Sequence, residues 1–456
     1  MKRVKRKHSI SLSTTQIIML SFLLVIALGS VLLALPISAA DGQAVPYIDA
    51  LFTATTATCV TGLVTVTTAT AWSTFGHVVI LILIQVGGLG VITILSWFML
   101  LLHRRMGLKD RLLIQDAFNL NTMAGLGKFI KSVVLGTLVI EVLGALAYMT
   151  VFVPQFGARG IWISIFNAVS AFCNAGMDII GENSLCDHAL NPVVGTVTSL
   201  LIILGGIGYI VWWDVLRVLK NFPRQRFRCF KGLTLHSKIA LSSTLLLIFV
   251  GAAIILLLEW NNPLTLQNHD LFDKLQLATF QSVTTRTAGF ATLPQQDLSN
   301  GTSVLSLLLM FIGGSPVGTA GGVKTVTITV LLISAFSTIR GQKEVSVFHR
   351  HIGQESVAKA AAVVCMSFMI VFLSTLLLSA VTAAPMLDVL YETVSAAATV
   401  GLSRNLTPFL NLWGKIIIII TMYLGRVGPI SLAIAFNLKK QTQNIILDPI
   451  EDISIG

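Results

Sequence analysis

The chain has 456 residues, of which 54% are hydrophobic and 11% charged, and its mean hydropathy is +0.84. About a quarter of the residues of a soluble domain are charged, so this composition excludes a soluble globular protein and predicts an all-α membrane protein with several spans. The formal charge of +11 does not indicate nucleic-acid binding, because the basic residues cluster in a few loops between apolar segments.

The N-terminus joins a basic stretch to a long apolar run. Residues 1–8 read MKRVKRKH, and residues 17–35 form a 19-residue apolar run. The apolar core of a secretory signal is about 7–15 residues long, whereas a spanning helix needs about 20. We therefore expect a cytoplasmic basic N-terminus over residues 1–16, followed by a first span that is retained.

Four units follow, each with a span, a short half-helix, a glycine motif and a second span. The predicted units cover 17–103, 128–219, 239–338 and 359–437, which makes eight transmembrane helices, and residues 438–456 form a cytoplasmic tail. The half-helices are too short and too polar to span, so we expect re-entrant segments at 47–57, 161–172, 270–284 and 387–398. Their C-terminal dipole ends favour a cation in the cavity that they face.

A glycine motif follows each half-helix. The fourth, Thr399-Val400-Gly401, resembles a potassium filter, in which backbone carbonyls replace the water shell of the ion. The motif glycines are 114, 113 and 112 residues apart, a near-constant period that indicates structural repeats. We expect four filter strands around one pseudo-fourfold pore, formed by Val60, Thr61, Gly62, Asn174, Ala175, Gly176, Thr287, Ala288, Gly289, Thr399, Val400 and Gly401.

The distribution of basic residues predicts the topology. Of the 31 Lys and Arg residues, 24 lie in five segments, at 1–8, 103–131, 217–238, 340–359 and 439–440. With eight spans all five fall on one side, so the positive-inside rule places them and both termini in the cytoplasm. The filter motifs then face outward, near several acidic residues. An acidic mouth would concentrate cations, but keeping basic residues inside produces the same pattern, and both interpretations stay open.

The second span of the third unit is interrupted by Gly313-Gly314-Ser315-Pro316-Val317-Gly318-Thr319-Ala320-Gly321-Gly322-Val323-Lys324. Five glycines and a proline in twelve residues are incompatible with a regular helix. Irregular backbone at membrane depth is tolerated where it lines a cavity, so we predict a flexible gate below the filter. We interpret the corresponding motifs at 87–90 and 205–208 as close helix packing.

Three cationic residues lie at unusual positions. Arg426 falls within the last apolar span, where an arginine is costly and usually functional. We expect it to hold the gate loop closed; the alternative is a structural arginine satisfied by buried carbonyls. Arg286 directly precedes the third filter motif and is expected to brace it, with Glu392 as candidate partner. Lys324 either ends the loop or points towards the cytoplasm.

Other chemistries find little support in the residues. The five cysteines are scattered without a C-x-x-C pair, so we expect no metal or disulfide role. There is no H-E-x-x-H motif, and Glu141, the clearest acid within a span, has no evident catalytic partner, so an enzyme is not expected. The alternative function is a sodium-coupled secondary transporter of another solute. Such folds show broken helices in corresponding halves, whereas one broken helix and four filter motifs are expected here.

The filter glycines, the GGSPVGTAGG loop and Arg426 together resemble the KtrB/TrkH/HKT superfamily of potassium transporters over nearly the whole chain. Eight spans without extra N-terminal ones are similar to its KtrB branch. The resemblance implies potassium uptake through a four-filter pore, gated by the intramembrane loop, in a bacterial plasma membrane. In plant relatives a serine in the first filter accompanies sodium transport, so Gly62 favours K⁺ as the transported ion, with Na⁺ left open as an activator.

The resemblance also implies partners. It predicts a homodimer whose cytoplasmic face binds a KtrA-type regulatory ring that binds ATP or ADP. The chain itself contains no P-loop and no G-x-G-x-x-G motif after a soluble strand, so nucleotide control requires another chain. No covalently bound cofactor and no nucleic-acid partner are expected.

Overall fold

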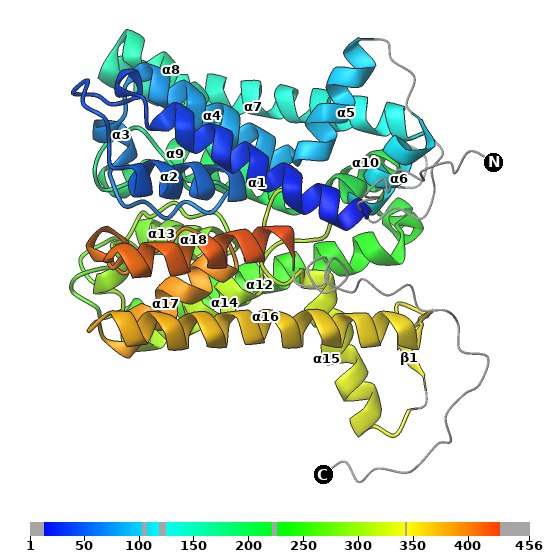
Figure 1. Cartoon of the computed structure of the whole chain (residues 1–456). Helices are drawn as coiled ribbons and strands as arrows, with labels where there is room; N and C mark the ends of the chain where they lie inside the picture. The colour runs from blue at the N-terminus through cyan, green and yellow to red at the C-terminus, as the bar shows by residue number, and fades with distance from the viewer. Residues whose placement is uncertain (1–12, 103–106, 118–124, 221–225, 343, 429–456) are drawn as a thin grey trace, which may run out of the picture.

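The computed structural model describes residues 13–102, 107–117, 125–220, 226–342 and 344–428 (Figure 1). The basic N-terminus up to residue 12, the predicted end of the last span and the tail lie outside the described residues. The described residues are mostly helical. The two short strands β1 (Val345–Val347) and β2 (Arg350–Ile352) form an antiparallel hairpin between the third and fourth units.

The helices repeat in the predicted order of long helix, half-helix and second helix. The first unit contains α1 (Thr14–Leu33), α2 (Tyr47–Cys59), α3 (Thr68–Ala71), α4 (Thr74–Leu89) and α5 (Val91–Leu101), and α6 (Leu108–Ala117) follows it. The second contains α7 (Leu126–Phe156), α8 (Ala158–Cys173), α9 (Pro192–Gly206) and α10 (Tyr209–Leu219). The third contains α12 (Leu235–Glu259), α13 (Leu271–Thr284), α14 (Asn300–Phe311) and α15 (Thr325–Ile339). The fourth contains α16 (Gln354–Val381), α17 (Met386–Ala397) and α18 (Leu412–Val427).

Short 3₁₀ turns lie in the connections. They are Pro36–Ser38, Cys186–His188, Arg226–Gly232, Gln295–Asp297 and Thr407–Phe409.

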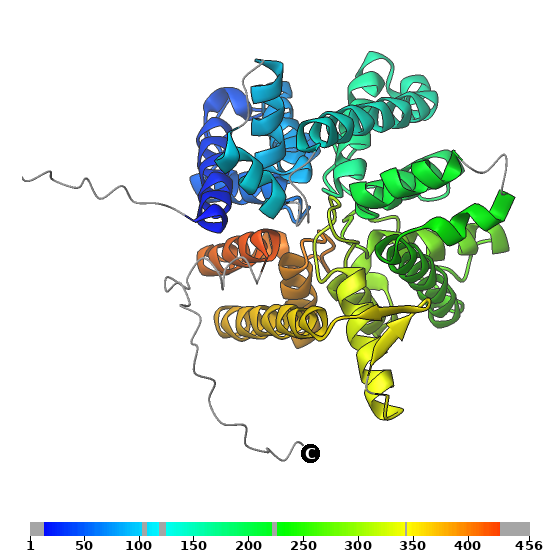
Figure 2. The ribbon, with the colours of Figure 1, turned by 90° about the vertical axis from the view of Figure 1, so that its right-hand side faces the viewer.

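The four units form a ring, which Figure 2 shows along the direction of the long helices. Each second helix packs against the half-helix of the next unit: α4 against α8, α9 against α13, α14 against α17, and α18 back against α2. The long helices form the perimeter, and their outward faces expose apolar side chains such as Leu24, Val142, Phe249 and Phe372. An apolar surface of this extent suits contact with lipid rather than water. The C-terminal parts of the half-helices are thereby mostly buried within the protein.

The start of every second helix is set by a polar N-cap. The side chain accepts a hydrogen bond from a backbone N–H of the first turn, which satisfies one of the free donors of a helix start. The four caps are Ser73, Asn191, Ser299 and Asn411. This local signal recurs in all four units and aligns the second helices with one another.

Among the described residues, four helices are long and apolar enough to cross a membrane, namely α1, α7, α12 and α16. Two bent pairs, α4 with α5 and α9 with α10, raise this number to six if each pair is one span. The remaining two predicted spans correspond to α14, which is followed by the glycine-rich loop and α15, and to α18, which ends at Val427.

The interpretation of the first two span motifs as packing alone is wrong. The pair α4–α5 bends by 96° at Gly90 and the pair α9–α10 by 98° beside Gly208. Both glycines have positive φ, +86° and +93°, which only glycine adopts readily. Gly428, at the same place in the fourth unit, has a φ of +89°. The second helix therefore ends at the same motif position in the first, second and fourth units. In the third unit the glycine-rich loop begins at this position.

Candidate ion pathway

The four filter segments share one backbone conformation. Each half-helix leads into a residue with left-handed φ, and these residues are Val60 (57°), Asn174 (60°), Thr287 (62°) and Thr399 (50°). Two residues later comes the motif glycine, with φ between +63° and +99° in the four units. Such a sequence of positive-φ residues turns the chain sharply at the end of the half-helix. The C-terminal dipole end of each half-helix and the carbonyl groups of the motif that follows it thus point towards the same central space.

The glycines bring the four segments into contact around one axis. A Cβ on Gly62 would lie 2.6 Å from the Ala175 carbonyl oxygen of the second unit. The same holds for Gly176 with Ala288 and for Gly289 with Val400, each also at 2.6 Å. Gly401 closes the ring against the Thr61 carbonyl oxygen. The twelve predicted filter residues are therefore brought together in one closed ring of backbone.

Hydroxyl groups behind the filters, which the sequence prediction missed, hold this backbone. The hydroxyl of Thr56 accepts the Gly62 N–H at 2.9 Å, and that of Ser395 accepts the Gly401 N–H at 3.0 Å. Ser170 accepts from Met177 N–H at 3.1 Å. All three stand six residues before their motif glycine. That shared position is the signal by which the sequence could have revealed them.

The third filter is braced differently. Val283 occupies the position of the three hydroxyl residues, and the neighbouring Thr284 instead donates to the Phe290 carbonyl at 2.6 Å. The side chain of Arg286 is buried behind this filter and donates to the Thr244 hydroxyl of α12 at 3.2 Å. The prediction that Glu392 is the partner of Arg286 is wrong. The Glu392 carboxylate accepts instead from the hydroxyls of Ser403 and Thr407.

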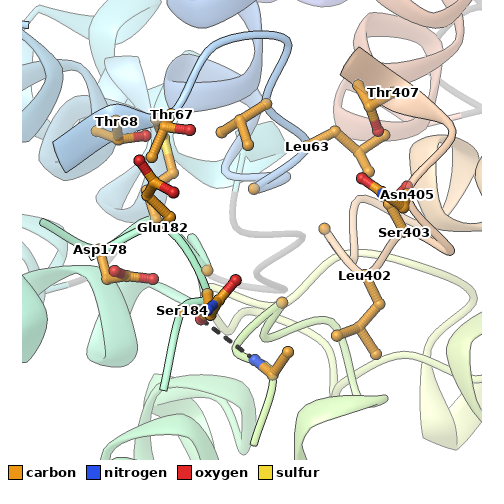
Figure 3. Close-up of a pocket in the computed structure, with 18 of the residues that line it drawn as sticks. Leu63, Thr67, Thr68, Asp178, Glu182, Ser184, Leu402, Ser403, Asn405 and Thr407 are labelled. Carbon is orange, nitrogen blue, oxygen red and sulfur yellow. Dashed lines mark hydrogen bonds between the residues drawn. The ribbon is translucent and has the colours of Figure 1, made fainter. Parts of the chain in front are cut away.

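Above the filter ring lies a cavity of about 720 Å³ (Figure 3). The four motif glycines form part of its lining, and Asp178 and Glu182 contribute carboxyl groups from the second unit. The Asp178 carboxyl is almost buried and accepts a hydrogen bond from the Ile180 N–H at 3.3 Å. Burial raises its pKa to about 6, although bonds from Ser184 and nearby backbone N–H groups lower it.

Below the ring, the glycine-rich loop is seated on the break in the second unit. Because the helix ends before Gly208, the carbonyls of Gly205 and Gly206 lack helical partners. They accept from the backbone N–H groups of Thr319 (3.1 Å) and Ser315 (2.8 Å). The Tyr209 N–H, at the start of α10, donates to the Val317 carbonyl at 3.0 Å. The loop thus satisfies backbone groups on both sides of the break.

Arg426 ties the loop to the first unit. Its guanidinium donates to the Thr319 carbonyl at 2.7 Å and to the Gly87 carbonyl, freed by the break in α4–α5, at 2.5 Å. Cavities of about 280 and 200 Å³ lie below the filter, and Arg426 lines both. Lys324 folds back on the loop, where its ammonium group donates to the Ala320 carbonyl at 2.6 Å. Both cations therefore contact the loop.

Comparison with known proteins places this arrangement in a family. The model of the TrkH family, described as a cation transport protein, matches residues 2–446. The chain belongs to the TrkH cation transport protein family. It is 41% identical over 442 residues to the Ktr system potassium uptake protein B of Bacillus subtilis, covering 97% of this chain and 96% of that one. It is 39% identical over 443 residues to the potassium/sodium uptake protein NtpJ of Enterococcus hirae, covering 96% and 95%.

A solved structure supports the TrkH-family fold. The potassium transporter TrkH from Vibrio parahaemolyticus superposes with a TM-score of 0.74 at 17% identity, covering 95% of this chain and 86% of that one. The predicted class, an all-α membrane protein of pseudo-repeats, is confirmed, as is the resemblance drawn from the sequence. The family is one of transporters and not of enzymes.

Proposed function

We propose that this TrkH-family chain conducts K⁺ into the cell through the four-filter ring. The observation that carries the proposal is the closed ring in which each motif glycine abuts a carbonyl of the next unit. Carbonyl groups aimed at one axis replace the water shell of an ion. The names of the relatives in B. subtilis and E. hirae, which are potassium and potassium/sodium uptake proteins, support the same cargo. In this proposal K⁺ is the preferred ion, and a role of Na⁺ as an activator stays open.

The ion path runs from the outer cavity through the ring to the cavities beside Arg426. The gate consists of Gly313, Gly314, Ser315, Pro316, Gly318, Thr319, Ala320, Gly321, Gly322, Lys324 and Arg426. Support comes from the loop's position below the ring and from the two carbonyls, on the loop and on α4, that hold Arg426. Because Arg426 of α18 bonds to the loop and Lys324 belongs to it, the closed position of the loop places positive charge in the path of a cation.

The alternative, a sodium-coupled transporter of another solute, gains from one observation. Broken helices occur at corresponding positions of the first and second units, a pattern of coupled transporters. In those folds the freed backbone groups bind solute and ion, whereas here the carbonyls of Gly87, Gly205 and Gly206 are occupied by Arg426 and the gate loop. The breaks thus support the gate, and conduction is favoured.

The proposal includes a setting and partners. We place the chain in the bacterial plasma membrane, with both termini and the basic loops in the cytoplasm, and with the predicted unit boundaries. The word "system" in the name of the B. subtilis relative supports a membrane subunit that works with others. We propose a homodimer on a KtrA-type ring that binds ATP or ADP, with the cytoplasmic basic loops as its docking region.

The test is growth of a potassium-uptake-deficient bacterium on limiting K⁺. Wild type is expected to restore growth, and Gly62→Ser is expected to admit Na⁺, because a Cβ would press on the Ala175 carbonyl from a backbone of φ +99°. Gly353→Ser is the matched control, since that glycine has ordinary φ and nothing within 4 Å of its Cβ position. The proposal would be overturned if the wild-type chain, present in the membrane together with a KtrA-type partner, failed to restore growth.

A further inference from the structure

Of the four residues that stand two before a motif glycine, Asn174 and Thr287 hydrogen-bond to the gate loop. The Thr319 hydroxyl of the loop lies 3.0 Å from the Asn174 side-chain oxygen and 3.0 Å from the Phe172 carbonyl oxygen. The Gly321 N–H of the loop donates to the Thr287 hydroxyl at 3.0 Å. Filter and loop, two separate motifs in the sequence, are therefore joined by direct hydrogen bonds in the second and third units.

We propose that Asn174 and Thr287 couple the gate to the filter, so that ion selectivity depends on the position of the loop. The inference rests on the proposed potassium conduction and extends it. In the closed position the loop fixes the side chains at the start of two filter strands. When the loop leaves, these side chains lose their partners, and the strands that they begin are no longer held in the same geometry.

Burial makes the coupling strong enough to matter. The side chains of Asn174, Thr287 and Thr319 are each at most 1% exposed. A buried polar group that loses its hydrogen-bond partner bears its full desolvation penalty, unlike an exposed one that turns to water. Opening therefore leaves groups in the filter that must rearrange or bind water or an ion. A filter strand cannot remain unchanged through this step.

The coupling is uneven around the ring. In the first unit Val60 stands at the same position and has no group that accepts or donates a side-chain hydrogen bond. In the fourth unit the loop is close to Thr399, because a Cβ on Gly321 would collide with its hydroxyl. The second and third strands are thus the ones that respond to the gate. Linkage also requires the reverse effect, by which ion occupancy of these strands shifts the loop by the same factor.

The experiment measures K⁺ and Na⁺ fluxes of the purified full chain in liposomes. Thr319→Val and Thr287→Val each remove one hydroxyl and keep the shape of the side chain. Thr319→Ser and Thr287→Ser retain the hydroxyl and serve as conservative variants. Thr329→Val is the matched control, since its hydroxyl donates to the Thr325 carbonyl within α15 at 2.8 Å.

Both valine variants are expected to raise the basal K⁺ flux and to lower the K⁺/Na⁺ flux ratio, each by about 2- to 10-fold, the range that one hydrogen bond provides. The serine variants keep the hydroxyl and should fall between the wild type and the valine variants, whereas Thr329→Val should match the wild type. A raised flux with an unchanged ratio would show that the contacts hold the loop without coupling it to selectivity, and unchanged fluxes would overturn the inference entirely. Absence of K⁺ flux in the wild type itself, with a KtrA-type partner supplied, would instead overturn the proposed function.

Discussion

At the scale of single residues, hydroxyl groups behind the filter motifs hold the backbone of the ring together with the glycines. The glycines could be predicted because their period recurs along the sequence and because close backbone approach requires them. Thr56, Ser170 and Ser395 were missed, since a hydroxyl within a helix usually bonds to a carbonyl of its own helix. Thr55, for example, donates to the Leu51 carbonyl. The choice between these bonds depends on the filter backbone and not on the residue type.

Replacement of Thr56 by Val tests the role of this hydroxyl. The change leaves the buried Gly62 N–H without its acceptor, at a cost of about 1–3 kcal/mol. We expect the K⁺/Na⁺ uptake ratio to fall about 10-fold, since about 1.4 kcal/mol corresponds to that factor. Competition uptake in membrane vesicles measures the ratio. Thr55→Val is the neighbouring control, and an equal loss there would assign the effect to packing.

The outer cavity predicts a pH effect through Asp178. Its pKa is raised by burial to about 6, so its charge is present above pH 6 and disappears as the external pH falls towards 5. We expect K⁺ uptake at limiting K⁺ to decline over this range, because one negative charge is lost from the mouth. Asp178→Asn should remove that part of the pH dependence. Identical pH profiles for the two proteins would exclude the role.

The same shift has a consequence for folding, with the opposite sign from a salt-bridged acid. The raised pKa means that the folded state holds the Asp178 proton more tightly than the unfolded state does. The charge therefore costs stability above pH 6, and this cost declines as the pH falls towards the ordinary carboxyl value. Asp178→Asn should accordingly be at least as stable as the wild type at pH 7 by thermal unfolding.

At the scale of elements, the helix breaks were the main failure of sequence prediction. A Gly-Gly-x-Gly motif in a span suits close packing and a break equally well. Which of them occurs depends on whether other groups satisfy the freed carbonyls. Here those groups are the loop N–H groups of Ser315 and Thr319, more than 100 residues beyond Gly205. The break in the third unit could be predicted because proline and five glycines exclude a helix locally.

Gly208→Ala tests whether the break is the seat of the gate loop. Alanine is strained at a φ of +93°, and its Cβ would meet the Pro316 carbonyl oxygen of the loop. Strain of this kind costs about 1–3 kcal/mol, so we expect a lower thermal unfolding midpoint and a raised basal K⁺ flux. The control is Gly136→Ala in α7, where the nearest atom, on Trp212, would be 3.6 Å away. A lower unfolding midpoint with an unchanged K⁺ flux would show that the helix break stabilises the fold but does not hold the gate loop closed.

At the scale of the whole molecule, one chain builds a ring whose first and last units must meet. The period of the glycines predicted the ring, but the contacts that close it pair residues far apart in sequence. Lys415 of α18 bonds to Asp49 of α2 at 2.5 Å. Arg404 pairs with Asp388 of its own unit and donates to the Ser303 hydroxyl of the third unit at 2.8 Å. Complementary charges on four units allow several pairings, and only the packed structure selects among them.

The Asp49–Lys415 pair should stabilise the closed ring. Both side chains are largely buried, so removing one charge leaves the other without compensation. We expect Lys415→Met and Asp49→Asn each to lower the thermal unfolding midpoint of the purified protein. The double variant should recover part of the loss, as a coupled pair does in a double-mutant cycle. Additive losses would show that the two groups act independently.

The most direct test of potassium conduction is ion flux through the purified chain in liposomes under an imposed membrane potential. A conducting pore requires no gradient of a second ion, so K⁺ should enter in proportion to the potential with no Na⁺ or H⁺ gradient present. Na⁺ should enter more slowly, and Gly62→Ser should narrow the difference. Uptake that follows a Na⁺ gradient and ceases in its absence would contradict the pore and establish the coupled transporter instead.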